Sequence, residues 1–242
     1  MLKKPHLLTM VPIYLVLILL CVTISKAVSK TWTTMVEGAP LEHRNCIVLD
    51  AGHGGIDGGA LSCTGIPESQ LNLQITQRLN DLLNFLGYNT VMLRDTDTSL
   101  HNQGSTIAAQ KISDLKQRVS LINQHSPTLL ISIHQNTFSD KRYSGGQIFY
   151  CADEESQKLA QKLQNQYIQA LNPGSKRKPK QAKGIYIMEH IQCSGILVEC
   201  GFLTNEAEEA RLRTDSYQKK ISAVISTTVS TWYVQKDNAS CC

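Results

Sequence analysis

The chain has 242 residues, of which 42% are hydrophobic and 18% are charged, so it can bury one sizeable core and is not disordered throughout. Its formal net charge is only +4 at pH 7, and its lysines and arginines are mostly dispersed, which argues against nucleic acid as a partner. The eight cysteines form no disulfide framework that their spacing reveals, so no bridge is predicted.

An apolar segment near the N-terminus predicts export across the cytoplasmic membrane. Lys3 and Lys4 precede an uncharged stretch that runs from Leu7 to Ser25. This stretch is long for a signal core and short for a membrane span, so cleavage and retention both remain open, and the protein is expected to be secreted or membrane-anchored. The predicted organisation is a signal peptide or anchor at 1–27, a linker at 28–44, a folded domain at 45–236 and a polar tail at 237–242.

Apolar runs with strand character alternate with amphipathic helical patterns over the rest of the chain. In one such pattern Leu71, Ile75 and Leu79 recur at helical spacing, and Gly87 suits the end of that helix. We therefore expect a single α/β domain with a mixed, mostly parallel sheet of about six strands, flanked by about five helices. The expected strands are 46–51, 90–93, 128–133, 147–151, 185–188 and 195–199, and the expected helices are 68–86, 114–125, 154–171, 206–213 and 217–234.

Two histidines follow predicted strands at the edge where α/β sheets place their ligands. His53 lies in the segment DAGHGG after the first strand, and His134 lies in SIHQN at the end of another. A lone histidine there would more often be an ordinary hydrogen-bonding residue, but two at one edge favour a shared site. The glycines around His53 could instead cradle phosphate, but the Walker lysine and the dinucleotide spacing are absent.

Two glutamates complete a possible catalytic set. Glu68 begins a predicted helix near the same edge, where it could bind a cation or only offset the helix dipole. Two imidazoles and one carboxylate are a ligand set that catalytic zinc uses. Glu199 ends the apolar run GILVE and could serve as a general base, or it could be a buried glutamate paired with a lysine or arginine.

These four motifs, DAGHGG, ESQLNL, SIHQN and VECGFLTN, resemble the signature of zinc-dependent N-acetylmuramoyl-L-alanine amidases of the amidase_3 type over residues 46–234. The resemblance implies that His53, Glu68 and His134 bind one Zn²⁺ per chain, and that Glu199 is the general base and acid. It also implies a peptidoglycan substrate, cleaved at the amide between the lactyl group of N-acetylmuramic acid and L-alanine.

The membrane segment and the stretch KGIYIMEH before CSGILVEC are similar to the germination-specific amidases of spore formers. That similarity implies a role in spore cortex maturation toward muramic lactam, at the forespore cortex, and a possible membrane lipoprotein activator. Cys193 and Ser194 depart from the usual pattern, in which a proline is common before the strand.

Two further residues and two rival functions complete the expectations. Asn136 and Arg118 are candidates to bind substrate or to orient a metal ligand. A zinc peptidase acting on stem peptides, or a wall-binding scaffold that needs a partner for activity, are the alternatives to an amidase.

Overall fold

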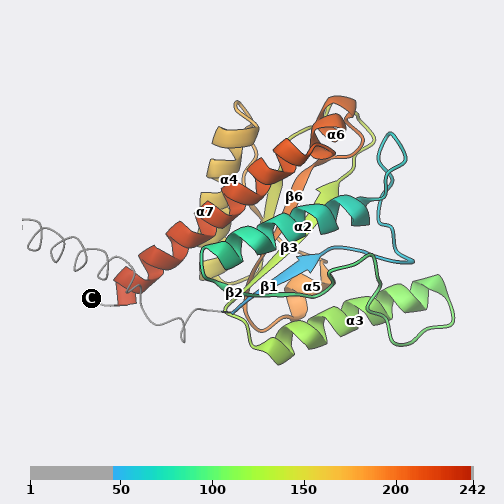
Figure 1. The fold of residues 1–242 in the computed structure, drawn as a ribbon, viewed down its shortest axis with the longest axis horizontal. Coiled ribbons are helices and arrows are strands. Elements are labelled where there is room, and N and C mark those ends of the chain that lie inside the picture. The colour runs from blue at the N-terminus through green and yellow to red at the C-terminus, as the bar shows by residue number, and fades with distance from the viewer. Residues whose placement is uncertain (1–45, 241–242) are drawn as a thin grey trace, which may run out of the picture. The chain divides into compact units, whose positions relative to one another are not determined.

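The structure, a computed structural model, describes residues 46–240 (Figure 1). The predicted leader at 1–27 and the predicted linker at 28–44 lie outside these residues, as do the last two residues of the predicted tail. Within 46–240, no helix is both long enough and apolar enough to cross a membrane.

A six-stranded sheet runs through the middle of the domain in the order β2-β1-β3-β6-β4-β5. The first four strands in this order are mutually parallel, β4 is antiparallel to β6, and β5 is parallel to β4. The predicted mixed, mostly parallel sheet is therefore confirmed. The strands are β1 (Cys46–Ala51), β2 (Asn89–Met92), β3 (Leu129–Asn136), β4 (Gln147–Tyr150), β5 (Lys180–Gln181) and β6 (Ser194–Phe202).

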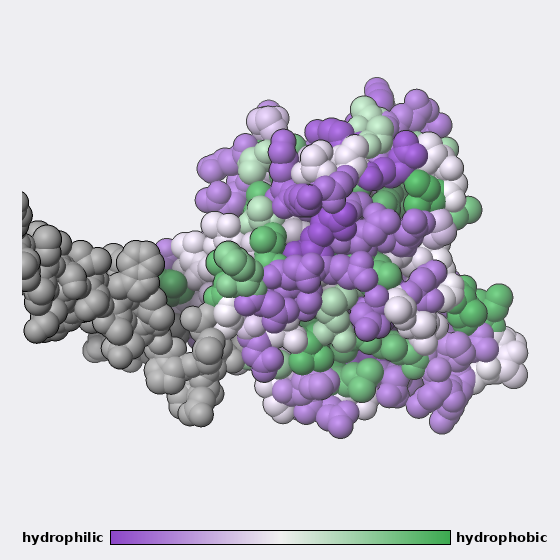
Figure 2. All heavy atoms as spheres, viewed as in Figure 1, coloured by the Kyte–Doolittle hydropathy of each residue, from purple (hydrophilic) through white to green (hydrophobic). Residues whose placement is uncertain are grey.

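Helices cover both faces of the sheet (Figure 1). One face carries α2, α4 and α7, and the other carries α3 and α5. Polar side chains cover most of the outer surface seen over α2 and α7, as amphipathic helices require (Figure 2). The helices are α2 (Glu68–Phe85), α3 (Ile107–His125), α4 (Glu154–Leu171), α5 (Tyr186–His190), α6 (Glu206–Leu212) and α7 (Asp215–Ser240).

The strand period of two residues divides the core into two layers. In β1, Ile47 and Leu49 belong to the cluster beneath α2, α4 and α7, whereas Val48 belongs to the cluster beneath α3 and α5. All three side chains are fully buried, and each such burial contributes about 1.5–3 kcal/mol. β1 is thus buried on both faces, and the loop after Ala51 begins at the carboxyl end of this central strand.

Two local predictions need correction. Residues 185–188 were expected to form a strand, but they lie in the short helix α5, and β5 supplies the sixth strand instead. A run of four apolar residues does not distinguish a strand from one helical turn. Helix α3 begins at Ile107 and not at Asp114, because the hydroxyl of Thr106 accepts a hydrogen bond from the Ala109 N–H and caps an earlier turn.

Candidate metal centre

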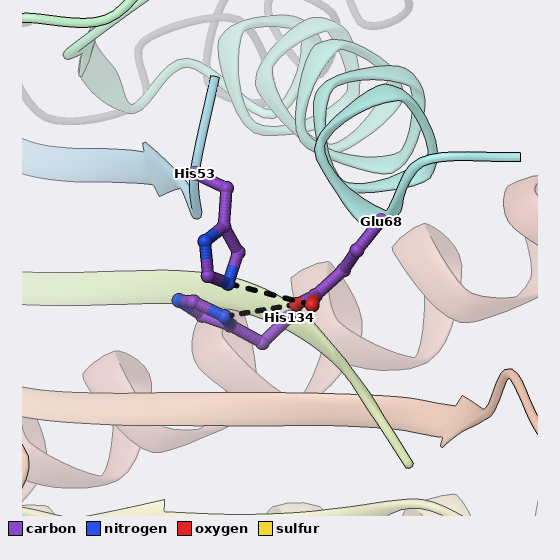
Figure 3. A group of neighbouring side chains, drawn as sticks. All are labelled: His53, Glu68 and His134. Atoms are coloured by element: carbon purple, nitrogen blue, oxygen red, sulfur yellow. Dashed lines mark hydrogen bonds and ion pairs between the residues drawn. The ribbon is translucent and has the colours of Figure 1, made fainter. Parts of the chain in front are cut away.

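Three side chains from separate segments meet just past the end of β1, beside the last residues of β3 (Figure 3). His53 lies two residues past the end of β1, His134 lies in β3, and Glu68 is the first residue of α2. One ligand atom from each residue lies within 4.8 Å of the others, and the two imidazole centroids are 5.1 Å apart. The structure therefore brings together all three residues predicted to bind a metal.

Hydrogen bonds fix the carboxylate of Glu68, whose side chain is only 5% exposed. Its Oε1 lies 3.1 Å from His134 Nδ1 and accepts from the Gln135 N–H (3.1 Å) and from Asn72 Nδ2 (3.2 Å). Its Oε2 accepts from the Ala60 N–H at 3.1 Å. Burial would raise the pKa of Glu68, but the nearby imidazoles hold this pKa well below its usual range, so the group is an anion.

The backbone of His53 is strained, and two neighbours hold it. Its φ is 62°, a region that side-chain-bearing residues rarely adopt. Arg118 Nη2 donates to the His53 carbonyl at 2.7 Å, and Asp57 Oδ2 lies 2.8 Å from His53 Nδ1. The other ring nitrogen, Nε2, is thereby directed at Glu68 Oε2, 3.4 Å away. Burial would lower the pKa of His53, but the carboxylates of Glu68 and Asp57 raise it to about 9.

Two glycines give the imidazoles room. A Cβ on Gly52 would lie 2.2 Å from the His134 ring, and a Cβ on Gly59 would lie 2.7 Å from Glu68 Oε2 and 2.8 Å from the His53 ring. Such distances are far below van der Waals contact, so any larger residue would displace the candidate ligands. The glycine-rich sequence therefore allows backbone to approach the site closely, as glycine commonly does.

Glu199 occupies β6 directly beside His134 of β3 in the sheet register. Its Oε2 is buried and has no hydrogen-bond partner among residues 46–240. Burial raises the pKa of Glu199 to about 7, with the imidazole of His134 opposing this rise and the Glu68 carboxylate adding to it. A carboxyl group poised near neutral pH can both accept and return a proton, which a general base and acid must do.

The two candidate substrate-binding residues lie in different environments. Arg118 is 1% exposed and forms ion pairs with Asp50 and, at 2.6 Å, with Asp114. This burial argues against contact between Arg118 and substrate, whereas the alternative role, the support of a metal ligand, agrees with its bond to the His53 carbonyl. Asn136 is half-buried at the end of β3, and its contact with substrate stays a prediction.

Sequence reasoning missed three residues that support the site. Asp57 orients His53, and Asn72 joins Glu68 to the Gly52 carbonyl (3.1 Å). Buried Arg94 donates to the carbonyls of Ala51, Gly52 and Ser69, which ties the loop after β1 to the first turn of α2. Asn72 could have been predicted, because residues four apart on a helix lie on the same face and Asn72 follows Glu68 by four. No sequence pattern identified Arg94.

The donor set suits zinc. Two imidazoles and one carboxylate match the ligand set of catalytic zinc sites, which keep one position open. The side chains of His53 and His134 are 27% and 18% exposed, so solvent and substrate can reach them. The Asp57–His53 contact is the kind of outer carboxylate that fixes a metal-binding imidazole.

Comparison with known proteins agrees with this geometry. Residues 47–231 match the Amidase_3 family model, described as N-acetylmuramoyl-L-alanine amidase. The germination-specific N-acetylmuramoyl-L-alanine amidase of Bacillus subtilis is 34% identical over 209 residues, covering 86% of this chain and 85% of that protein. The CwlD amidase of Clostridioides difficile, solved in complex with the GerS lipoprotein, is 32% identical with a TM-score of 0.76, covering 79% of this chain and 99% of that one.

A second solved structure, an N-acetylmuramoyl-L-alanine amidase from Clostridium difficile 630, is 28% identical with a TM-score of 0.70, covering 80% of this chain and 98% of that one. The sheet order, the convergent imidazoles and carboxylate, and the family match over most of the chain agree with one another. The chain belongs to the Amidase_3 family of N-acetylmuramoyl-L-alanine amidases.

Proposed function

We propose that this peptidoglycan amidase is zinc-dependent, with His53, Glu68 and His134 as the metal ligands and Glu199 as the general base and acid. The scissile bond joins the lactyl carbonyl of N-acetylmuramic acid to the nitrogen of L-alanine. The observation that carries the proposal is the convergence of the three ligand atoms within 4.8 Å, next to a buried carboxyl oxygen without a hydrogen-bond partner in residues 46–240.

When bound, zinc supplies a Lewis acid that makes a water molecule more acidic and polarises a carbonyl group. Glu199 takes a proton from the attacking water, whose oxygen forms a bond to the lactyl carbon. The carbon–nitrogen bond then breaks, and Glu199 returns the proton to the departing alanine nitrogen. Its pKa of about 7 suits both transfers, because neither protonation state is strongly favoured near neutral pH.

The test combines metal analysis with product analysis. The purified chain should hold one zinc per molecule, and His134→Ala should lose it. On muropeptides, mass spectrometry should find intact N-acetylmuramic acid and free stem peptides that begin with L-alanine. Products cut between stem amino acids would instead indicate a zinc peptidase, and binding to cell wall without any cleavage would indicate a scaffold.

The biological setting is part of the same proposal. The relative in B. subtilis is named germination-specific, and we infer that this chain likewise acts on spore cortex peptidoglycan, outside the cytoplasmic membrane. The complex of CwlD with the GerS lipoprotein supports a lipoprotein partner for this chain as well. Deletion of the gene should remove muramic lactam from cortex muropeptides, and co-purification from sporulating cells should recover a lipoprotein.

A further inference from the structure

Two aromatic side chains are exposed on the loop that leaves the site. Phe138 and Tyr143 lie between β3 and β4 and are 47% and 46% exposed. Their ring centroids are 4.5 Å apart at 54°, and Tyr143 also lies 6.2 Å from the buried ring of Phe202. Exposing large apolar side chains together is unfavourable in water, so such a patch commonly marks a binding surface.

The patch continues the strands that carry the catalytic candidates. Phe138 follows His134 by four residues, and Phe202 follows Glu199 by three residues on the neighbouring strand. At a rise of about 3.3 Å per extended residue, the Cα atom of Phe138 can lie at most about 13 Å from that of the candidate ligand His134. That range includes the distance of a second sugar ring from an amide attached to the first.

Several hydrogen bonds hold the loop in place. Both carboxylate oxygens of Glu208 accept from the Gly145 N–H, at 2.9 and 3.0 Å. The Phe138 N–H donates to Thr204 Oγ1 at 3.2 Å, and Asn205 Nδ2 donates to the Lys141 carbonyl at 2.8 Å. The aromatic rings are therefore presented by a loop anchored to the segment after β6, which lowers the entropic cost of binding.

Charged side chains flank the two rings. Arg142 is paired with the carboxylate of Asp140 at 2.7 Å, and Arg177 lies over the Phe202 ring and donates to the Ser144 carbonyl. Both guanidinium groups have partners within the protein, although Arg142 is 90% exposed and the neighbouring Lys141 is exposed as well, so the case for a sugar depends on the aromatic rings and not on the charges. A pyranose ring presents a face of C–H groups that packs well on aromatic rings.

We propose that Phe138 and Tyr143 form a sugar-binding subsite that holds the ring next to the muramic acid bearing the scissile amide. This inference rests on the proposed function and defines its substrate further, as a glycan strand and not an isolated muramoyl peptide. A substrate with at least one further sugar beside the muramic acid should therefore be cleaved with a higher kcat/KM than a substrate with a single sugar.

The experiment compares two substrates with the same stem peptide. One is a stem-bearing glycan strand, and the other is N-acetylmuramoyl-peptide with a single sugar. In the double variant Phe138→Ala/Tyr143→Ala, kcat/KM should fall about tenfold or more on the glycan, chiefly through KM, and by less than about twofold on the single-sugar substrate. Zinc content and the melting temperature verify that the variant is folded and loaded.

Phe85→Ala is the matched control. Phe85 is 87% exposed at the opposite end of α2 from Glu68, about 25 Å along the helix, so its removal should change neither rate. Equal losses on the two substrates, or no loss on either, would overturn the sugar subsite. Because both substrates carry the same stem peptide, an equal loss on the two would assign the rings to peptide binding.

A binding measurement separates this inference from the proposed function. Stem-free glycan strands, which contain no scissile amide, should bind the wild-type chain and should bind the double variant about tenfold more weakly. If the wild type cleaves no muramoyl amide, the proposed function fails, while binding of the stem-free glycan still tests the subsite. If the amide is cleaved but the stem-free glycan binds both proteins equally, the subsite fails alone.

Discussion

Glu208 and Glu209 are sequence neighbours on α6, and their buried carboxylates hold two different loops of the site. Glu208 accepts from the Gly145 N–H in the loop after β3 and from the Phe202 N–H at 2.8 Å. Glu209 Oε1 accepts from Ser62 Oγ at 3.0 Å and from the Thr64 hydroxyl at 2.6 Å, in the loop that leads to α2. One short helix therefore positions loops from both sides of the metal centre.

Glu209→Ala should destabilise the fold and weaken zinc binding together. The change removes the carboxylate that accepts from the hydroxyls of Ser62 and Thr64 and pairs with Arg213, at a cost of about 1–3 kcal/mol of unfolding free energy. The loosened loop ends at Glu68, so zinc affinity should fall as well. Urea unfolding and zinc titration against a chelating dye measure the two effects.

Two further variants serve as a control and as a partial rescue for Glu209→Ala. Glu206→Ala alters an exposed residue of the same helix and should change neither quantity appreciably. Glu209→Gln keeps one acceptor oxygen and should recover part of the zinc affinity. Unaltered zinc affinity in a destabilised Glu209→Ala chain would restrict Glu209 to a structural role.

Glu199→Gln should reduce turnover about a hundredfold or more and leave the zinc content unchanged, because it removes a proton carrier and no metal ligand. Stability should not fall, since the buried Oε2 has no hydrogen-bond partner within 46–240. Amidase assays, metal analysis and unfolding curves test these three points. Retention of full activity would remove Glu199 from the mechanism.

The same variant should change the pH dependence of stability in the metal-free chain. The pKa of Glu199 rises on folding from 4.5 to about 7, so the folded state binds the proton more tightly than the unfolded state does. Stability of the wild type should therefore decline as the pH rises through this interval. Glu199→Gln should lack this decline when urea unfolding is compared across the interval.

Asp50→Asn should cost about 3–5 kcal/mol of stability, because it leaves the buried guanidinium of Arg118 without one of its two anionic partners. Burial would raise the pKa of Asp50, but Arg118 keeps this pKa below its ordinary value. The stabilisation is thus present above the unfolded pKa of about 3.9 and is lost as the pH falls below it.

Acid unfolding curves should therefore be less steep for Asp50→Asn than for the wild type. Asp81→Asn, at an exposed position on α2, serves as the control and should behave like the wild type. An unchanged acid transition in Asp50→Asn would contradict the coupling between Asp50 and Arg118.

Gly52→Ala should abolish zinc binding and activity, because its Cβ would occupy the space of the His134 ring. Gly58→Ala is a close control in the same loop, since its Cβ would meet only Pro67, at an ordinary 3.5 Å. Metal analysis of both variants checks the prediction. Full zinc occupancy in Gly52→Ala would show that His134 can move without loss of coordination.

The order of strands and helices in this chain was largely predictable, because apolar periodicity reflects which face of each element is buried. The failures came where that signal is short or absent. Residues 185–188 carry too few positions to separate strand from helix, and the two residues of β5 carry no apolar pattern at all.

The sequence by itself determined the candidate chemistry. His53, Glu68, His134 and Glu199 each stand at a predicted strand end or helix start, and parallel strands bring such ends to one edge. Only the tertiary structure decided what supports them, since contacts such as Arg118 to the His53 carbonyl and Glu209 to Thr64 join residues far apart in sequence. Such contacts depend on packing geometry, which no local pattern of residues encodes.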